Sequence, residues 1–206
     1  MTTRLYIARH GQSEWNLENK IQGIQDTNLT ETGIRQAQLL AKRLKSEKID
    51  CIYSSDLKRA HETAQIIAQE FGLEVKKIPE LREMSFGVWE GLTAEEINKL
   101  YKEIYQLWRI NPDKAVIEKA ETLKEVQKRI LIETYNIIEE NRGKNILIVS
   151  HGTSIKALIL GILGIDLSFY PKIRLDNTSL NIIDIKEDGK AVLVLLNDTC
   201  HLRSDV

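Results

Sequence analysis

The chain has 206 residues, of which 42% are hydrophobic and 29% are charged. This composition is typical of a soluble globular protein and excludes a collagen-like fibre or a largely disordered chain. With 29 lysines and arginines against 30 aspartates and glutamates, the formal net charge is −1. A general nucleic-acid binder needs a broad basic face, so nucleic acid is not an expected partner. The length suits a single domain, which we expect to span residues 1–206.

No segment approaches the ~18 consecutive apolar residues of a membrane span, so no membrane partner is expected. The first eight residues, MTTRLYIA, are too short and too quickly polar for a signal peptide. Two cysteines, Cys51 and Cys200, do not make a disulfide framework. We therefore expect a cytoplasmic protein.

Short apolar runs alternate along the chain with amphipathic stretches of helical spacing. In chain order, we expect a strand at 5–8, a helix at 30–45, a strand at 49–53 and a helix from about 56 to 71. An irregular stretch with one short strand near 73–78 follows. Capping-box patterns then open two more helices after Thr93 and Thr122, the first running through Trp108 to Pro112.

The end of the chain completes this pattern. A buried strand at 145–150 precedes an apolar helix that ends at Gly164, and strands at 180–185 and 191–196 flank the hairpin signal Asp188-Gly189. Strands followed by helices favour a three-layer α/β/α sandwich with a mostly parallel central sheet. We expect the C-terminal hairpin to be antiparallel and a helical excursion near residues 73–142 to cover one end of the sheet. An exposed edge strand in the hairpin would allow a homodimer.

Three of the expected strands end in clusters of cationic or small polar residues. These clusters are residues 8–11 (ARHG), 53–59 (YSSDLKR) and 149–152 (VSHG). Ligands of open α/β sheets bind outside the carboxyl ends of the strands, so His10, His151, Arg9 and Arg59 should meet at one rim. Glycine after each histidine would let the backbone approach a ligand closely. Two histidines and two arginines beside helix N-termini predict a phosphate site.

Residues 9–16 (RHGQSEWN) resemble the signature of the histidine phosphatase superfamily, also called phosphoglycerate-mutase-like. Further matches follow in the order of that family at 29–33 (LTETG), 53–60 (YSSDLKRA), 81–91 (LREMSFGVWEG) and 150–152 (SHG). The tripeptide RHG alone is a weak signal, but these motifs in this order are specific. The resemblance covers nearly the whole chain.

The resemblance implies a metal-independent mechanism. His10 would attack phosphorus to form a phosphohistidine, with its other ring nitrogen donating to a backbone carbonyl near Gly11. Arg9, Arg59 and His151 would hold the equatorial phosphoryl oxygens. Glu83 would protonate the leaving alkoxide and then deprotonate the attacking water. We expect Glu83 to be a competent acid only in the substrate complex, because a bound phosphate dianion favours the protonated carboxyl.

Five more residues are candidates for phosphate or substrate binding: Asn16, Gln22, Gly23, Gly152 and His201. The amides of Asn16 and Gln22 would donate hydrogen bonds. His201 lies in a tail similar to those of the α-ribazole, broad-specificity and metal-independent phosphoserine phosphatases of the family. In the last group a tail histidine helps to recognise the amino acid, so His201 is a candidate for the pocket, although a structural or solvated position is the favoured alternative. We expect no cofactor and no metal, since the histidines lack close ligand spacing.

The reaction that the resemblance implies is hydrolysis of a small phosphorylated metabolite. The family's cofactor-dependent mutases carry a longer insertion with an adjacent arginine pair, whereas residues 107–112 (LWRINP) contain one arginine. The alternatives are a cofactor-dependent phosphoglycerate mutase and a catalytically silent phosphate-binding module. The family's Gly-Gly-Glu-Ser segment appears here as residues 119–122 (KAET), which leaves the role of Glu121 open.

Overall fold

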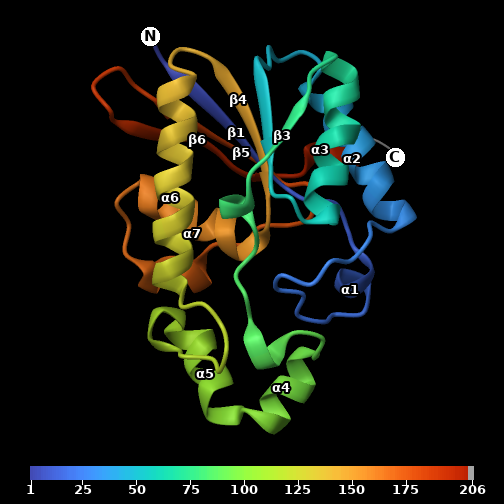
Figure 1. Ribbon diagram of the computed structural model, residues 1–206, viewed down its shortest axis with the longest axis vertical. Helices are drawn as coiled ribbons and strands as arrows, with labels where there is room; N and C mark the ends of the chain where they lie inside the picture. The colour runs from blue at the N-terminus through green and yellow to red at the C-terminus, as the bar shows by residue number, and fades with distance from the viewer. Residues whose placement is uncertain (204–206) are drawn as a thin grey trace.

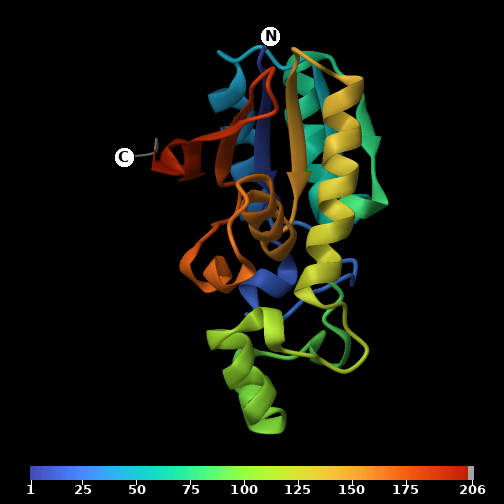
Figure 2. The ribbon, with the colours of Figure 1, turned by 90° about the vertical axis from the view of Figure 1, so that its left-hand side faces the viewer.

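The computed structural model describes residues 1–203 and contains a six-stranded sheet between two helical layers (Figures 1 and 2). The strands are β1 (Thr3–Arg9), β2 (Cys51–Ser54), β3 (Val75–Lys77), β4 (Asn145–Ser150), β5 (Leu180–Ile185) and β6 (Ala191–Asp198). Their order is β3-β2-β4-β1-β5-β6. Neighbours from β3 to β1 are parallel, whereas β5 and β6 are antiparallel to their neighbours. The predicted fold class and the C-terminal hairpin are therefore confirmed.

Helices cover both faces of the sheet. On one face lie α2 (Glu31–Leu44) and α3 (Lys58–Phe71), and on the other lie α6 (Leu123–Glu140) and α7 (Gly152–Ile162) (Figure 1). The short α1 (Glu14–Leu17), with α4 (Ala94–Leu100) and α5 (Lys102–Ile110), lies beyond the carboxyl ends of the parallel strands (Figures 1 and 2). Helices α4 and α5 of the predicted excursion therefore cover one end of the sheet, whereas β3 and α6 of the same stretch belong to the sheet and to one of the helical layers (Figure 1).

The central strands β1 and β4 are apolar in their middle positions, 5–8 and 146–149, because both of their faces are buried there. Side chains alternate between the faces of a strand. In β4, Ile148 joins the core under α6 and α7, while Leu147 and Val149 join the core under α2 and α3. These fully buried strands hold the loops at their carboxyl ends in fixed positions.

The helix predicted from Thr93 to Pro112 is wrong in one respect, because the structure divides it into α4 and α5. The break lies at Tyr101, whose backbone leaves the helical region (φ −134°, ψ 41°). Ile97 is fully buried, but Leu100 is 62% exposed, so the two do not share one buried face. After the break, Trp108 of α5 packs edge-on against Phe86, with ring centroids 5.5 Å apart. Aromatic packing therefore overrides a continuous helical repeat.

The helix caps follow the sequence closely. Thr30 accepts a hydrogen bond from the Gly33 N–H at 3.0 Å, and both predicted capping boxes, at Thr93 and Thr122, are present. Helix α3 begins at Lys58 rather than near Asp56, because Asp56 instead forms a bidentate ion pair with Arg82.

Gly11 packs closely against Gly33 of α2. A Cβ atom on Gly11 would lie 2.5 Å from the carbonyl oxygen of Gly33, and one on Gly33 would lie 2.0 Å from that of Gln12. Close packing of α2 against the loop after β1 therefore requires glycine at both positions. This contact also explains why the segment 29–33 accompanies the RHG motif.

Within the described part of the chain, no helix combines the length and the apolar character needed to cross a membrane.

Candidate active site

The predicted site residues meet at the carboxyl ends of β1, β2 and β4. Arg9 pairs with Ser150 in the parallel β1–β4 ladder, and the next residue on each strand is a histidine. The rings of His10 and His151 have centroids 5.1 Å apart and planes inclined by 57°. Strand pairing thus brings together two imidazoles from distant parts of the sequence.

His10 is buried and neutral. Its Nδ1 lies 2.7 Å from the carbonyl oxygen of Gly11, and because a carbonyl only accepts, Nδ1 carries the proton. Burial and the positive charges of Arg59 and Arg9 hold the pKa of His10 well below 6.5. The Nε2 atom therefore keeps a free electron pair, as a nucleophile requires.

His151 lies beside His10 and is fully buried. Its Nε2 is 2.8 Å from the hydroxyl of Ser55, which already accepts a hydrogen bond from the Leu57 N–H at 3.2 Å. The Ser55 hydroxyl has one proton and two lone pairs, so it can donate to Nε2 or accept from it, and donation by Ser55 corresponds to a ring proton on Nδ1. Nδ1 is buried and has no hydrogen-bond partner within residues 1–203. Burial, followed by the charge of Arg59, lowers the pKa of His151 well below 6.5.

Arg9 and Arg59 give this end of the sheet its positive charge. Arg59 donates from Nη1 to the carbonyl of Gln25 (2.7 Å) and from Nη2 to that of Gly23 (2.8 Å). Arg9 donates from Nη1 to the carbonyl of Leu175 (2.8 Å). The Nε atoms of both arginines are buried without a partner in the described chain. Burial lowers the pKa of Arg9 and lowers that of Arg59 to about 10, so both remain cations at neutral pH. Such donors suit an anion.

Glu83 lies close to His151 because its carboxylate caps the N-terminus of α7. Its Oε1 accepts from the backbone N–H of Met84 (2.9 Å) and of Ser154 (3.1 Å), and its Oε2 accepts from that of Thr153 (3.1 Å). A carboxylate at a helix N-terminus is favoured by the helix dipole. Since α7 begins directly after His151, this cap fixes the carboxylate beside the histidine pair.

These groups border a cavity of about 210 Å³. Eight of the predicted site residues line it, namely Arg9, His10, Asn16, Gln22, Gly23, Arg59, Glu83 and Gly152. We call this hollow the phosphate cavity. His151 is not among the residues that line the cavity, but its ring centroid lies only 5.1 Å from that of His10, which does line it.

The oxygens of both predicted amides, Asn16 and Gln22, accept hydrogen bonds from protein donors. The Asn16 Oδ1 atom accepts from the Ser13 N–H (3.2 Å) and from Asn177 Nδ2 (3.1 Å). The Gln22 Oε1 atom accepts from the hydroxyls of Ser13 (2.8 Å) and Thr27 (2.6 Å). With both oxygens occupied, each amide has its NH₂ group left as a donor for a ligand.

The structure does not bring His201 to the phosphate cavity. His201 is buried, and its Nε2 lies 3.3 Å from the hydroxyl of Thr178, whose backbone N–H donates to the carbonyl of His10. The chain turns at Asn197, which adopts a left-handed conformation (φ 53°) and hydrogen-bonds Asp176. This turn carries the tail behind the loop of His10.

Sequence reasoning missed a clamp on the loop of Glu83, formed by Arg129 and Glu121. Arg129 of α6 donates to the carbonyls of Glu80 (2.7 Å), Arg82 (2.9 Å) and Glu83 (3.0 Å). Its Nε and Nη2 also donate to Glu121 (2.7 and 2.9 Å). Glu121 in turn accepts from the Ser85 N–H at 2.9 Å. The retained glutamate of the 119–122 segment was the one available signal for this Arg129–Glu121 clamp.

Glu90, a further missed residue, joins two loops of the cavity wall. Its carboxylate accepts from the N–H of Ile24 (3.2 Å), from the N–H of Phe86 (3.0 Å) and from Gln25 Nε2 (2.7 Å). Gly23 makes this possible, since its φ is +54° and a Cβ there would lie 2.0 Å from Glu90 Oε1. Packing against Glu90 is thus a sufficient reason for glycine at position 23.

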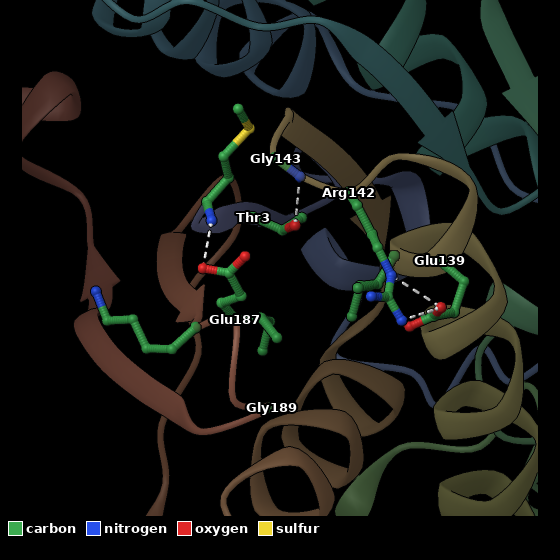
Figure 3. A pocket seen from close by; sticks show the side chains of 10 residues that line it. Thr3, Glu139, Arg142, Gly143, Glu187 and Gly189 are labelled. Carbon is green, nitrogen blue, oxygen red and sulfur yellow. Dashed lines mark hydrogen bonds and ion pairs between the residues drawn. The ribbon is translucent and has the colours of Figure 1, made fainter.

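A second hollow, of about 320 Å³, lies at the opposite end of the sheet (Figure 3). Its charged groups are already paired, Arg142 with Glu139 and the N-terminal ammonium with Glu187. Gly143 donates its N–H to the hydroxyl of Thr3. In contrast to the phosphate cavity, none of the described residues that line this hollow has a buried side-chain donor without a partner.

Within residues 1–203, no cluster of three or more histidine, cysteine, aspartate or glutamate side chains could hold a metal ion.

The family of the chain follows from comparison with known proteins. The model of the histidine phosphatase superfamily (branch 1) matches residues 5–199, so the chain belongs to this superfamily. The predicted resemblance is confirmed.

Relatives with different names resemble the chain along nearly its whole length. Phosphoserine phosphatase 1 of Hydrogenobacter thermophilus is 36% identical and is aligned over 97% of this chain and 94% of its own. A probable phosphoglycerate mutase, GpmB, of Yersinia pestis is 34% identical over the same shares. Among solved structures, a phosphoserine phosphatase mutant from Entamoeba histolytica in complex with phosphoserine has a TM-score of 0.88 and 37% identity. That alignment covers 97% of this chain and 99% of the other.

The buried neutral histidines predict a pH-dependent stability. The unfolded chain protonates histidine near pH 6.5, whereas folded His10 and His151 resist protonation. Stability therefore falls as the pH drops below 6.5, by up to about 1.4 kcal/mol per pH unit for each histidine. Urea unfolding between pH 7.5 and 5.5 measures this slope. His151→Asn should reduce it, and a wild-type profile flat over that interval would contradict the burial of neutral rings.

The Arg129–Glu121 clamp predicts a loss of rate without loss of phosphate binding. Arg129→Met keeps the aliphatic stem but frees the loop of Glu83, and misplacing a catalytic group by ~1 Å costs roughly 10²-fold in rate. We expect kcat to fall while inhibition by inorganic phosphate is retained. The control is Arg142→Met, which removes an exposed arginine distant from the phosphate cavity. Equal kcat values for Arg129→Met and Arg142→Met would show that the Arg129–Glu121 clamp does not position Glu83.

Proposed function

We propose that this chain hydrolyses small phosphomonoesters in the phosphate cavity, through a phosphohistidine on His10 and without a metal. The observation that carries the proposal is a buried, neutral His10 whose Nε2 is free, set beside arginines with unpartnered buried Nε atoms. A nucleophile surrounded by fixed donors suits phosphoryl transfer, in which positioning and charge stabilisation supply most of the catalysis.

In the first step, the phosphoryl oxygens bind Arg9, Arg59 and His151. The electron pair of His10 Nε2 attacks phosphorus, and the bond from phosphorus to the ester oxygen breaks. Glu83, which the bound phosphate dianion favours in its protonated form, gives its proton to the departing oxygen. The products are a free alcohol and a phosphohistidine, with Glu83 as a carboxylate.

In the second step, water attacks the phosphohistidine. Glu83 takes a proton from the water as its oxygen bonds to phosphorus, and the bond from phosphorus to His10 Nε2 breaks. Inorganic phosphate leaves, His10 is again neutral, and Glu83 is again protonated for the next cycle.

Hydrolysis is favoured over mutase activity by the position of Arg109. This is the arginine of the 107–112 segment, and it is exposed and absent from the wall of the phosphate cavity. The arginine pair that the family's mutases carry in this region therefore has no counterpart at the cavity. Stimulation of 3-phosphoglycerate isomerisation by 2,3-bisphosphoglycerate would instead support the mutase.

The substrate that we propose first is phosphoserine. Its support is the alignment with proteins named phosphoserine phosphatase over nearly the full chain and the small volume of the cavity, about 210 Å³. A larger ester such as α-ribazole phosphate would extend well outside this volume. A small phosphorylated metabolite also suits the cytoplasmic location that we propose.

The general-acid role of Glu83 predicts a dependence on the leaving group. In Glu83→Gln, phosphoenzyme formation from phosphoserine should slow by roughly 10²- to 10⁴-fold, because an alkoxide needs a proton to leave. Formation from p-nitrophenyl phosphate should slow far less, because p-nitrophenolate leaves unprotonated. Stopped-flow and quench measurements of the first turnover separate the two. The control is Glu80→Gln, an exposed carboxylate in the same loop. Equal slowing with both substrates would remove Glu83 from this role.

We also propose that β6 pairs with β6 of a second copy of the chain. This strand forms one edge of the sheet, and Val192, Val194 and Leu196 on it are each at least 40% exposed. Lys190 precedes the strand and Asp198 ends it. Antiparallel pairing about a two-fold axis places opposite charges together at both ends.

Light scattering in solution tests this dimer. We expect the mass of two chains for the wild type and of one chain for Val194→Lys, since a charge at the centre of the edge opposes pairing. Val116→Lys, at a position 69% exposed elsewhere, is the control and should remain dimeric. A monomeric wild type at micromolar concentration would overturn the proposal.

A further inference from the structure

The wall of the phosphate cavity includes groups that the proposed mechanism does not use. Besides the phosphoryl-binding residues, Lys20, Phe86, Lys156 and Tyr170 border the cavity. Two of these are cations. In an enzyme for phosphomonoesters, groups next to the phosphoryl site face the part of the substrate that differs between esters, so these residues bear on substrate choice.

Lys156 is held in place by an aromatic ring. Its Nζ lies 4.6 Å from the ring centroid of Tyr170, within the distance of a cation–π contact. The Tyr170 hydroxyl donates to the hydroxyl of Thr153 at 3.0 Å, so the ring is tied to the first turn of α7. Lys156 lies on the same helix, five residues after His151. The ammonium thus has a defined position relative to the catalytic residues.

Lys156 also lacks a counter-charge. Within residues 1–203 no carboxylate lies within ion-pair distance of its Nζ, and Glu83, which attracts it, has its oxygens bound to backbone N–H groups. Burial, with a smaller effect from the charge of Arg9, lowers the pKa of Lys156. Lys20 differs, since its Nζ already pairs with Glu18 at 2.6 Å. A half-buried ammonium without a partner is stabilised by an anion that a ligand brings.

The phosphoryl group has donors of its own in Arg9, Arg59 and His151. The anion for Lys156 is therefore a second one, carried by the ester group of the substrate. Among small metabolites, the anion that most suits a lysine ammonium beside an aromatic ring is a carboxylate a few bonds from the phosphoester oxygen.

We propose that Lys156, held over Tyr170, binds a carboxylate of the substrate and so selects phosphorylated hydroxy acids or hydroxy amino acids. This inference rests on the proposed phosphatase function and adds a residue that determines specificity. Lys156 touches the group that remains on the alcohol product, so its removal affects one class of ester more than another.

The test compares esters that differ only in a carboxylate. Phosphoserine and phosphoethanolamine form one pair, and 3-phosphoglycerate and glycerol phosphate form a second. We expect Lys156→Gln to lower kcat/KM for the carboxylate-bearing member by roughly ten- to hundredfold more than for its partner. Lys156→Arg, which keeps the charge, should restore part of the preference. The control is Lys172→Gln, which removes an exposed lysine whose Nζ lies 4.2 Å from the Phe169 ring centroid but which does not line the cavity; it should show no loss that is selective for the carboxylate.

Three outcomes overturn the proposal. A wild type without preference for the carboxylate in either pair, or a Lys156→Gln variant that keeps the preference, would show that no carboxylate binds there. An equal loss for both members of each pair would assign Lys156 to the phosphoryl group or to folding. Failure of the proposed function is distinct, because the wild type would then release no phosphate from these esters or from p-nitrophenyl phosphate.

Discussion

The parallel pairing of β1 with β4 is the constraint on which the site depends. The ladder sets Arg9 opposite Ser150, so the residues that follow, His10 and His151, leave the sheet side by side with rings 5.1 Å apart. Burial beside two arginines keeps both rings neutral. The same environment also buries the Nε donors of Arg9 and Arg59, which have no hydrogen-bond partner within residues 1–203. An oxyanion would satisfy them, so the site is organised for a ligand at the expense of stability.

Contacts from other elements hold Glu83, the proposed general acid, close to His10 and His151. Glu83 lies on a loop with little regular structure, yet its carboxylate caps α7 and its backbone carbonyl accepts a hydrogen bond from Arg129. Glu90 ties the same stretch to the loop that Arg59 also holds. Four separated segments thus form one rigid wall. Because α7 carries the groups next to His151 as well as Lys156, the phosphoryl site and the proposed carboxylate site share a single helix.

Much of this arrangement could be predicted because it is local or follows from sheet geometry. The strands, the caps at Thr30 and Thr122, and the meeting of His10 with His151 all follow from apolar patterns and from the rule that parallel strands end at one rim. The role of Arg129 could not be predicted in this way. The helical pattern of its segment indicates an ordinary surface position, and its three carbonyl partners are distant in sequence. The break at Tyr101 depends on aromatic packing with Trp108 and its neighbours. The position of His201 depends on a left-handed turn at Asn197, which a strand pattern does not reveal.

Direct detection of the covalent intermediate tests the central claim. A radiolabelled phosphomonoester is mixed with the wild type, quenched in alkali within the first turnover, and the protein is digested and mapped. The account predicts a phosphoramidate, stable to alkali and labile to acid, on His10. Label on another residue, or turnover that proceeds with no labelled protein at any quench time and persists in His10→Ala, would contradict it.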